Sequence, residues 1–211
     1  MSEGSALLIP LAIASAVTAR IALPFAALPL AAAGLIAFAF RDPERTIATR
    51  EDAALSPADG RVLRVAQEFD DYWQQDMTEV GIFLALQDVH VQRWPIAGEV
   101  VAQRRKAGGY RPAMTEAARH GNNQLVHYLQ TAAGPCTVTQ ISGLVARRIV
   151  PWTQVGEHVE QGDRLGMIKF GSQVTLRLPT SARVLVSAGD RVVGGRTVIA
   201  ELAPPARSHD A

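Results

Sequence analysis

The residue pair Gly171–Ser172 has the chemistry of a self-cleaving site. A serine hydroxyl that lies against the preceding carbonyl can attack it and convert the amide into an ester. Elimination and hydrolysis then leave a pyruvoyl group on the new chain end. The turn must be tight, and glycine adopts backbone angles that other residues resist. The dipeptide alone is weak evidence, because Gly4–Ser5 repeats it and most Gly-Ser pairs are ordinary turns.

Self-cleavage also needs a base for the serine proton and donors for the oxyanion, since a free hydroxyl is a poor nucleophile. His90, in the run Gln87–Arg93, is the leading candidate for the base. Asp59, in a Pro-Ala-Asp-Gly turn, is the candidate that orients and polarises a histidine as the third member of a triad. The structural alternatives are a buried, satisfied histidine and a local turn aspartate. Whether His90 or Asp59 takes the proton stays open.

The sequence contains no motif for a metal ion, a nucleotide or a dinucleotide cofactor. The remaining histidines have no metal-ligand spacing, and there is no P-loop or dinucleotide fingerprint. We therefore expect no metal ion and no diffusible cofactor. A formal net charge of +1 gives no strong field for a polyanion, so we expect no nucleic-acid partner. The single cysteine, Cys136, cannot pair within the chain, which fits a reducing compartment.

An apolar segment precedes the residues that carry this chemistry. Residues 6–40 contain Arg20 as their only charged side chain, and the run Ile21–Phe40 has the length of a helix that crosses a ~30 Å hydrocarbon core. Arg20 and two prolines argue against two full spans. We expect residues 1–45 to form an apolar helical membrane anchor: one span, a tight helical hairpin or a segment within one leaflet. The alternative is a buried helical pair of a soluble protein.

The charges that flank this segment predict its orientation. Arg41, Arg45 and Arg50 follow it, whereas the extreme N-terminus carries Glu3 and no basic side chain. The positive-inside bias places the rest of the chain at the cytoplasmic face of the cell membrane.

From residue 46 to residue 203 the pattern is that of a β-rich catalytic domain. Short runs rich in Val, Ile and Leu alternate with turn signals, which predicts a mainly β fold, a β-sandwich or partly open barrel of hairpins. A short helix is expected at Ala113–Arg119, and residues 204–211 are expected to be a disordered tail. The predicted strands are Arg61–Ala66, Glu79–Leu86, Glu99–Gln103, Gln124–Leu129, Leu144–Val150, Val174–Leu178, Arg183–Val186 and Thr197–Leu202.

A weak internal repeat supports the hairpin architecture. The run Gly162–Ile168 is echoed by Gly189–Gly194. A Pro/Ser-x-x-Gly-x-Val phrase recurs at Pro57–Val62, at Pro95–Val100 and, loosely, at Ile141–Val145. Such repetition is typical of short strand-and-turn units.

Five sequence blocks, in this order, resemble the short form of the phosphatidylserine decarboxylase family. The blocks are Phe40–Arg45, Ser56–Val62, Phe83–Gly98, Gln140–Ile149 and Gly162–Val174. The resemblance covers nearly the whole chain after the apolar segment. It implies a pyruvoyl-dependent enzyme that converts phosphatidylserine to phosphatidylethanolamine at a membrane.

The resemblance also implies roles for single residues. Ser172 would become the covalent pyruvoyl group, His90 is the motif histidine, and Asp59 is its acidic partner. Cleavage at Gly171–Ser172 would give a β chain of residues 1–171 and an α chain of residues 172–211. The two chains would remain together as a heterodimer that acts on a phospholipid, with higher oligomers left open.

Three positions depart from the family pattern. Arg93 stands where longer members have a second histidine, and Gln173 stands where the family usually has arginine. The run Asn122–Gln124 replaces an Asn-Glu-Arg type of segment. These changes leave the lipid head group more open than the chemistry.

Two other interpretations remain at this point. One is a non-enzymatic, membrane-anchored β module or adaptor of the biotinyl or lipoyl type, with Lys169 as the carrier residue. Ile168 and Phe170 flank that lysine, whereas carriers have small or methionine neighbours there. The other is a degenerate decarboxylase that no longer cleaves itself.

Overall fold

The computed structural model describes five stretches of the chain: residues 10–16, 23–39, 41–144, 148–168 and 172–203. The chain divides into two compact units, Met1–Asp42 and Pro43–Ala211. The predicted disordered tail and Gly171 both lie outside the described residues.

The first unit is helical. Residues 10–16 form one helical segment, and α2 (Leu23–Ala39) contains Pro29. Helix α2 occupies most of the apolar run Ile21–Phe40, and every one of its residues is uncharged. Within the described residues, no helix is long and apolar enough to cross a membrane. The expected anchor therefore has no support as a span.

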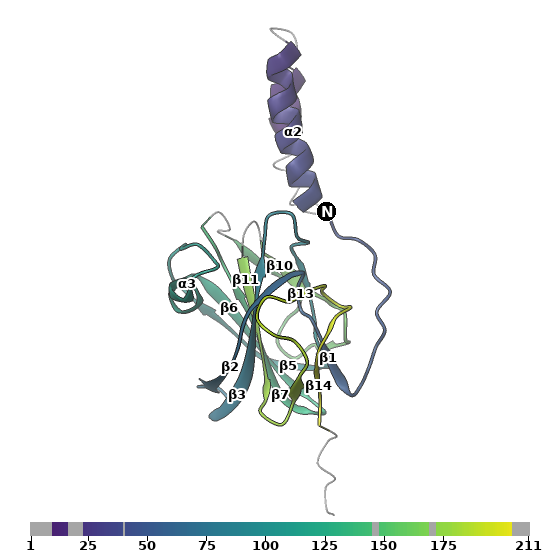
Figure 1. Ribbon diagram of the computed structural model, residues 1–211, viewed down its shortest axis with the longest axis vertical. Coiled ribbons are helices and arrows are strands. Elements are labelled where there is room, and N and C mark those ends of the chain that lie inside the picture. Colours follow the sequence, from purple (N-terminus) through teal and green to yellow (C-terminus); the bar gives the residue numbers. More distant parts are fainter. Residues whose placement is uncertain (1–9, 17–22, 40, 145–147, 169–171, 204–211) are drawn as a thin grey trace, which may run out of the picture. The chain divides into compact units, whose positions relative to one another are not determined.

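The second unit is mainly β, as predicted, and contains one short helix, α3 (Glu116–Gly121), close to the helix expected at Ala113–Arg119 (Figure 1). Thr115 caps this helix by accepting a hydrogen bond from the amide of Ala118. Its strands are β1 (Ala53–Leu55), β2 (Gly60–Asp70), β3 (Gln75–Leu84), β4 (Val91–Arg93), β5 (Gly98–Lys106), β6 (Gln124–Thr131), β7 (Gly134–Ile141), β8 (Ile149–Pro151), β9 (His158–Val159), β10 (Arg164–Ile168), β11 (Ser172–Pro179), β12 (Arg183–Val184), β13 (Arg191–Val192) and β14 (Val198–Glu201).

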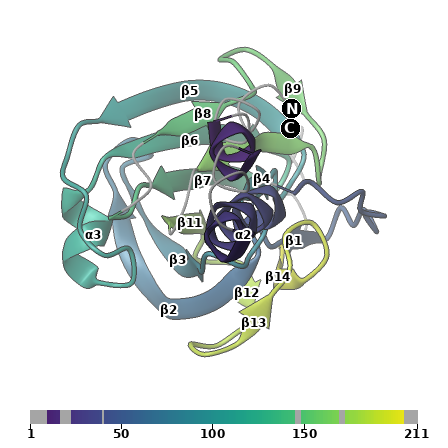
Figure 2. The same cartoon turned by 90° about the horizontal axis from the view of Figure 1, so that it is seen from above.

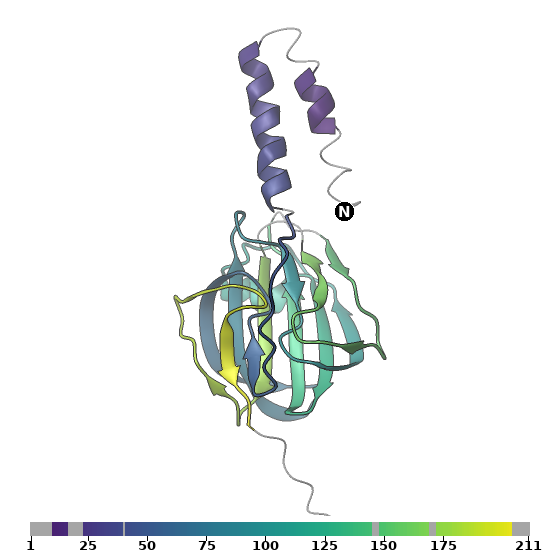
Figure 3. The ribbon, with the colours of Figure 1, turned by 90° about the vertical axis from the view of Figure 1, so that its right-hand side faces the viewer.

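The strands form one large and two small sheets. The eight-stranded sheet has the order β13-β2-β3-β11-β7-β6-β5-β9, and the small sheets have the orders β1-β14-β12 and β4-β10-β8. All paired strands are antiparallel. Seen from above, the large sheet is strongly curled (Figure 2), and β11 and β7 lie in the middle of its strand order. Figure 3 shows the small sheets on the open side. The fold is the partly open barrel of hairpins rather than a flat sandwich.

Most predicted strands are confirmed, whereas β1, β4, β7, β9, β10 and β13 have no predicted counterpart. Two of the differences have a clear physical cause. The predicted strand Leu144–Val150 is wrong at its start, because Leu144 lies in a bend and β8 begins at Ile149. Strand β7 was not predicted. It begins with Gly134 and Pro135, which read as a turn, although six of its eight residues are buried. Tertiary burial outweighs these local signals.

The internal repeat corresponds to a repeated turn. Gly162 and Gly189 both have positive φ values, 92° and 100°, which glycine adopts without strain. The next residue in each turn, Asp163 or Asp190, accepts a backbone amide from three residues earlier through its side chain. The two turns then bond the backbone of Trp94 and Val62 in the same way. The repeat is therefore structural.

The core runs along one face of β11, which lies between β3 and β7. Val174, Leu176 and Leu178 are fully buried and alternate with residues on the opposite face, as the period of a strand requires. Burial of such side chains is worth roughly 1.5–3 kcal/mol each. Ser172 has the same parity, so it lies on the core face of this central strand.

Candidate active site

Ser172 is the first residue of β11 and is completely buried. It pairs with Leu84, the last residue of β3. Its Oγ has no hydrogen-bond partner in the described part of the chain. A buried hydroxyl without a partner costs about 1–3 kcal/mol, so native proteins keep few of them outside functional sites.

A second unpartnered serine hydroxyl lies on the neighbouring strand. Gln173 pairs with Ile141 of β7, so the antiparallel register places Ser142 opposite Ser172. Ser142 is also fully buried, and its Oγ has no partner among the described residues. Two hydroxyls thus lie on the core face of the sheet, at the point where β11 begins.

His90 lies on the segment that joins β3 to β4 and is 1% exposed. Its Nδ1 is 2.8 Å from the carbonyl oxygen of Asp88. A carbonyl can only accept, so the neutral ring carries its proton on Nδ1 and has its lone pair on Nε2. In this tautomer Nε2 is the nitrogen that can accept a proton.

The strand pairing brings His90 and Ser172 to the same end of the barrel. The segment 85–90 leads from β3 to β4, and the segment 169–171 leads from β10 to β11. Strand β11 pairs with β3, and β10 pairs with β4. Leu84 at the end of β3 lies opposite Ser172, and Val91 at the start of β4 lies opposite Met167 near the end of β10. The amide of Ile168 donates to the carbonyl of His90 at 3.4 Å, which ties the end of β10 to His90.

Asp59 is held by other residues than His90. Its two carboxylate oxygens accept from the guanidinium of Arg45 at 2.6 and 2.9 Å, and Oδ1 also accepts the amide of Gly194 at 2.8 Å. Arg45 is almost fully buried and also donates to the carbonyl of Gly194. Within the described residues, a hydrogen bond between Asp59 and His90 is absent. The geometry gives Asp59 the task of fastening the segment around Arg45 to the β unit.

Asp88 shapes the segment that carries His90. Its Oδ2 accepts the amide of Ala85 at 2.8 Å, and its Oδ1 accepts from Arg191 at 2.5 Å. Together with the bond from His90 to its carbonyl, these contacts make Asp88 the main support of the histidine segment.

A buried chain of amide side chains, which the sequence did not reveal, leads to His90. Gln92 donates to the carbonyl of His90 at 2.7 Å, and Gln140 donates to Gln92 at 2.8 Å. His127 donates through Nε2 to Gln140 at 3.0 Å, and Gln103 donates to His127 Nδ1 at 3.1 Å. Every link donates toward His90. In the sequence these residues only appear as isolated polar positions within strands, a signal too weak to connect them.

The ring of His127 is neutral in this chain. Burial lowers its pKa from 6.5 to about 4; the hydrogen bond with Gln140 acts in the opposite direction, and Arg105 adds to the lowering. A neutral ring has one donor and one acceptor nitrogen, which matches its two neighbours. His127 therefore accepts from Gln103 and donates to Gln140 as an uncharged ring, so the hydrogen bonds keep one direction along the chain.

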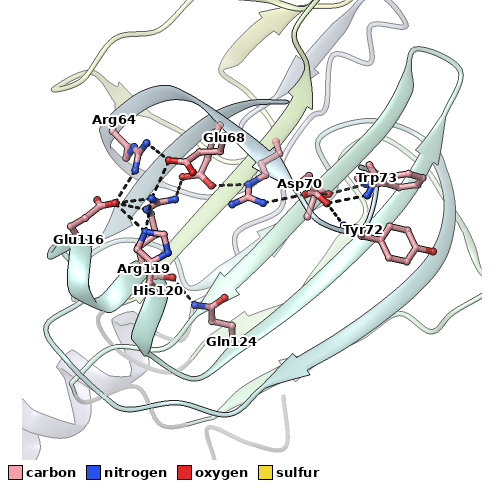
Figure 4. Close-up of polar contacts among 12 residues, drawn as sticks. Arg64, Glu68, Asp70, Tyr72, Trp73, Glu116, Arg119, His120 and Gln124 are labelled. Carbon is pink, nitrogen blue, oxygen red and sulfur yellow. Dashed lines mark hydrogen bonds and ion pairs between the residues drawn. The ribbon is translucent and has the colours of Figure 1, made fainter. Parts of the chain in front are cut away.

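Among the positions that depart from the family pattern, Arg93 and Gln124 have hydrogen-bond partners, whereas one side-chain atom of Gln173 has none among the described residues. Arg93 donates to the carbonyl of Gly162 at 3.0 Å and to that of Pro43 at 3.5 Å. Gln124 donates to the carbonyl of Arg119 at 2.6 Å at the end of α3, beside a cluster of ion pairs (Figure 4). Gln173 is buried on the face of β11 opposite Ser172, and its Oε1 has no partner among the described residues.

A pocket lies away from Ser172, and the described residues form no metal-binding cluster. A pocket of about 480 Å³ is lined by residues around Ile47, Arg93 and Gly162, and neither Ser172 nor His90 contributes to it. In the described part of the chain, no group of three or more His, Cys, Asp or Glu residues could hold a metal ion.

Comparison with known proteins gives the class of this protein. The family model described as phosphatidylserine decarboxylase matches residues 33–200. A phosphatidylserine decarboxylase proenzyme of Saccharopolyspora erythraea is 43% identical over 172 residues, which are 79% of this chain and 73% of the relative. One from Symbiobacterium thermophilum is 42% identical over 175 residues, 81% of each chain. A putative archaetidylserine decarboxylase proenzyme of Methanosarcina mazei is 40% identical over 164 residues, 77% of this chain and 73% of the relative.

The class is therefore a decarboxylase. The chain belongs to the phosphatidylserine decarboxylase family. This confirms the family resemblance, and it disfavours the carrier or adaptor alternative, whose carrier residue Lys169 lies outside the described residues.

Proposed function

We propose that this chain is a proenzyme that cleaves itself between Gly171 and Ser172 and then decarboxylates phosphatidylserine to phosphatidylethanolamine. The observation that carries the proposal is the buried hydroxyl of Ser172, which has no partner among the described residues and lies at the start of a central strand, in a chain of this family. An ordinary turn serine would be exposed or hydrogen-bonded.

The surroundings of Ser172 fit a pyruvoyl group. The residue is enclosed, and its Oγ is not engaged elsewhere in the described structure. The neighbouring hydroxyl of Ser142 can donate to a carbonyl oxygen at this position. When formed, the group supplies an acceptor for the electrons released as carbon dioxide leaves.

The self-cleavage proceeds in three steps: ester formation, elimination and hydrolysis. His90 accepts the proton of Ser172 through Nε2, and Oγ bonds to the carbonyl carbon of Gly171. The C–N bond then breaks as the nitrogen takes the proton from His90, which gives an ester and a free amine. Loss of the Cα proton then breaks the C–O bond, frees the carboxylate of Gly171 and leaves a dehydroalanyl end. Water hydrolyses the tautomeric imine and releases ammonia. Ser142 is the donor nearest in register to the developing oxyanion.

The sheet supports the proposed pairing of α and β chains. Strand β11, at the start of residues 172–211, is hydrogen-bonded to β3 on one side and to β7 on the other. Strands β13 and β14 also pair with strands of residues 1–171. These ladders hold the two fragments together after the backbone is cut.

The substrate and location are inferred from the relatives and from charge. The relatives are named for two lipids that share a serine head group, which supports a serine phospholipid as the substrate class. Arg41, Arg45 and Arg50 after the apolar run support a place at the cytoplasmic face of the cell membrane.

Intact mass under denaturing conditions tests the proposal. We expect chains of residues 1–171 and 172–211, the second with a pyruvoyl group in place of its serine. Ser172→Ala should give one uncut, inactive chain, and His90→Ala should slow cleavage by about 10²-fold or more. Ser187→Ala, an exposed serine of the same fragment, is the control and should cut normally. Cleavage or carbon dioxide release by Ser172→Ala would overturn the proposal.

A further inference from the structure

One row of residues crosses the large sheet at the end that holds Ser172. Lys106 pairs with Gln124, Gln124 with Ile141, Ile141 with Gln173, and Gln173 with Phe83. The segments beyond this row therefore project from the same end of the sheet, which we call the site end. Figure 1 shows α3 and the segment after β3 at this end of the β unit.

Four large apolar side chains are exposed at the site end. Leu86 follows β3 and is 45% exposed, and Leu144 follows β7 and is 60% exposed. Tyr110 and Met114, between β5 and α3, are 39% and 60% exposed. They come from three segments that are distant in sequence. Apolar side chains gathered in this way at one end mark an interaction surface.

Three unpaired cations accompany these side chains. Arg105, Lys106 and Arg111 are exposed, and no acidic residue occurs between Glu99 and Glu116. None of the three cations forms an ion pair with a described residue, whereas the arginines of the cluster in Figure 4 are all paired. The site end therefore presents positive charge that is free to meet an anionic surface.

The cationic segment is fixed to the site. The side chain of Asn122, which is fully buried, bonds both the amide and the carbonyl of Arg111 at 2.8 Å. The same side chain donates to the carbonyl of Ser142 at 2.7 Å. Ser142 lies opposite Ser172, so a surface that binds the segment around Arg111 is held in register with the reacting residue.

We propose that Arg105–Met114, with Leu86 and Leu144, forms a docking surface for an anionic phospholipid bilayer. The apolar side chains enter the interface, the cations meet the lipid phosphates, and the Ser172 end of the barrel faces the head groups. A bilayer fits better than a protein partner because the four exposed apolar side chains come from separate segments and the unpaired charges beside them are all positive. The inference rests on the proposed function in that it takes the substrate to be a membrane lipid.

Site-specific labelling tests this surface in the full chain. Met114→Cys carries a fluorophore, and Val155→Cys, whose parent residue is 56% exposed on another loop, is the matched control. Cys136 stays unlabelled because it is buried and burial raises the pKa of its thiol. With vesicles of phosphatidylcholine and phosphatidylglycerol, quenchers placed in the lipid should quench the Met114 label and spare the Val155 label. Equal quenching of both labels, or none at Met114, would overturn the proposal.

A charge variant separates docking from catalysis. The triple variant Arg105→Gln, Lys106→Gln, Arg111→Gln should weaken vesicle contact of the Met114 label by roughly 100-fold, at about fivefold for each cation. The control Arg164→Gln, Arg183→Gln, Arg196→Gln removes the same charge from other exposed positions and should have little effect. The site-end variant should still cleave itself and still act on a dispersed short-chain serine phospholipid. If the charge variant loses contact with vesicles but the unmodified chain never releases carbon dioxide, the docking surface is retained and the proposed function is overturned. Unchanged contact with normal cleavage would overturn the docking surface alone.

Discussion

The two faces of β11 treat their polar groups in opposite ways. On the outer face, Arg177 donates to Glu79 at 2.8 Å and to Asp70 at 3.2 Å, and Glu79 also accepts from Arg119 at 3.0 Å (Figure 4). On the core face, the hydroxyl of Ser172 has no partner among the described residues. One face uses its polar groups to hold the sheet together. The other keeps a reactive group available at a cost in stability, which is the pattern of a functional site.

Glu79→Gln removes the ion pairs of Glu79 with Arg119 and Arg177 on the outer face, and it should lower stability more than any of the other variants do. Glu79 is 1% exposed, and its loss leaves two guanidinium groups short of a partner, so the free energy of unfolding should fall by about 3 kcal/mol. Urea unfolding in a Ser172→Ala background, where the chain stays in one piece, measures it. Glu201→Gln, from the exposed pair with Arg183, is the control and should cost less than about 1 kcal/mol. Equal effects would show that burial does not distinguish the two pairs.

The buried ring of His127 makes the free energy of unfolding depend on pH. Its pKa is about 4 in the folded chain and 6.5 in the unfolded chain, so the unfolded state binds more protons between these values. Its contribution is complete above pH 6.5 and is lost as pH falls toward 4, by up to roughly 3 kcal/mol. His127→Gln should flatten the fall in unfolding free energy between pH 6.5 and pH 4. His120→Gln, at an exposed histidine, is the control for the loss of one imidazole. If the two variants show the same slope, the buried chain to His90 does not depend on a neutral ring.

Ser142→Ala removes a buried hydroxyl on the core face and should change the free energy of unfolding least. Its hydroxyl has no partner among the described residues, so its removal should leave the free energy of unfolding unchanged or raise it by up to about 1 kcal/mol. Ser56→Ala is the matched control: Ser56 is equally buried, but its Oγ donates to the carbonyl of Ala58 at 2.6 Å. That variant should lose about 1 kcal/mol. Urea unfolding in the Ser172→Ala background compares the two, and equal losses would mean that Ser142 is satisfied after all.

The sequence predicted the mainly β fold because alternating apolar residues and Gly, Pro and Asp turns are local signals. The repeated Gly-Asp turns at residues 162–163 and 189–190 are an example, since positive φ and an aspartate side chain fix each turn without help from distant residues. It missed β7, whose Gly-Pro start is a turn signal that burial overrides.

The motif residues could also be found from sequence, but their partners could not. Ser172, His90 and Asp59 stand in short blocks whose residue types indicate chemistry. The predicted orientation of a histidine by Asp59 remains a prediction, because the partners that the structure gives Asp59 are Arg45 and Gly194. Those partners lie 14 and 135 positions away along the chain.

The reactive residues and the local turns can thus be found from the sequence, because both follow from side-chain type and near neighbours. Three relations needed the folded structure: Ser172 is buried with no partner among the described residues, Ser142 lies opposite it, and the chain from Gln103 to Gln92 ends at His90. These relations depend on strand order and register. The register joins residues from distant strands, and a change of one position would turn every side chain to the other face.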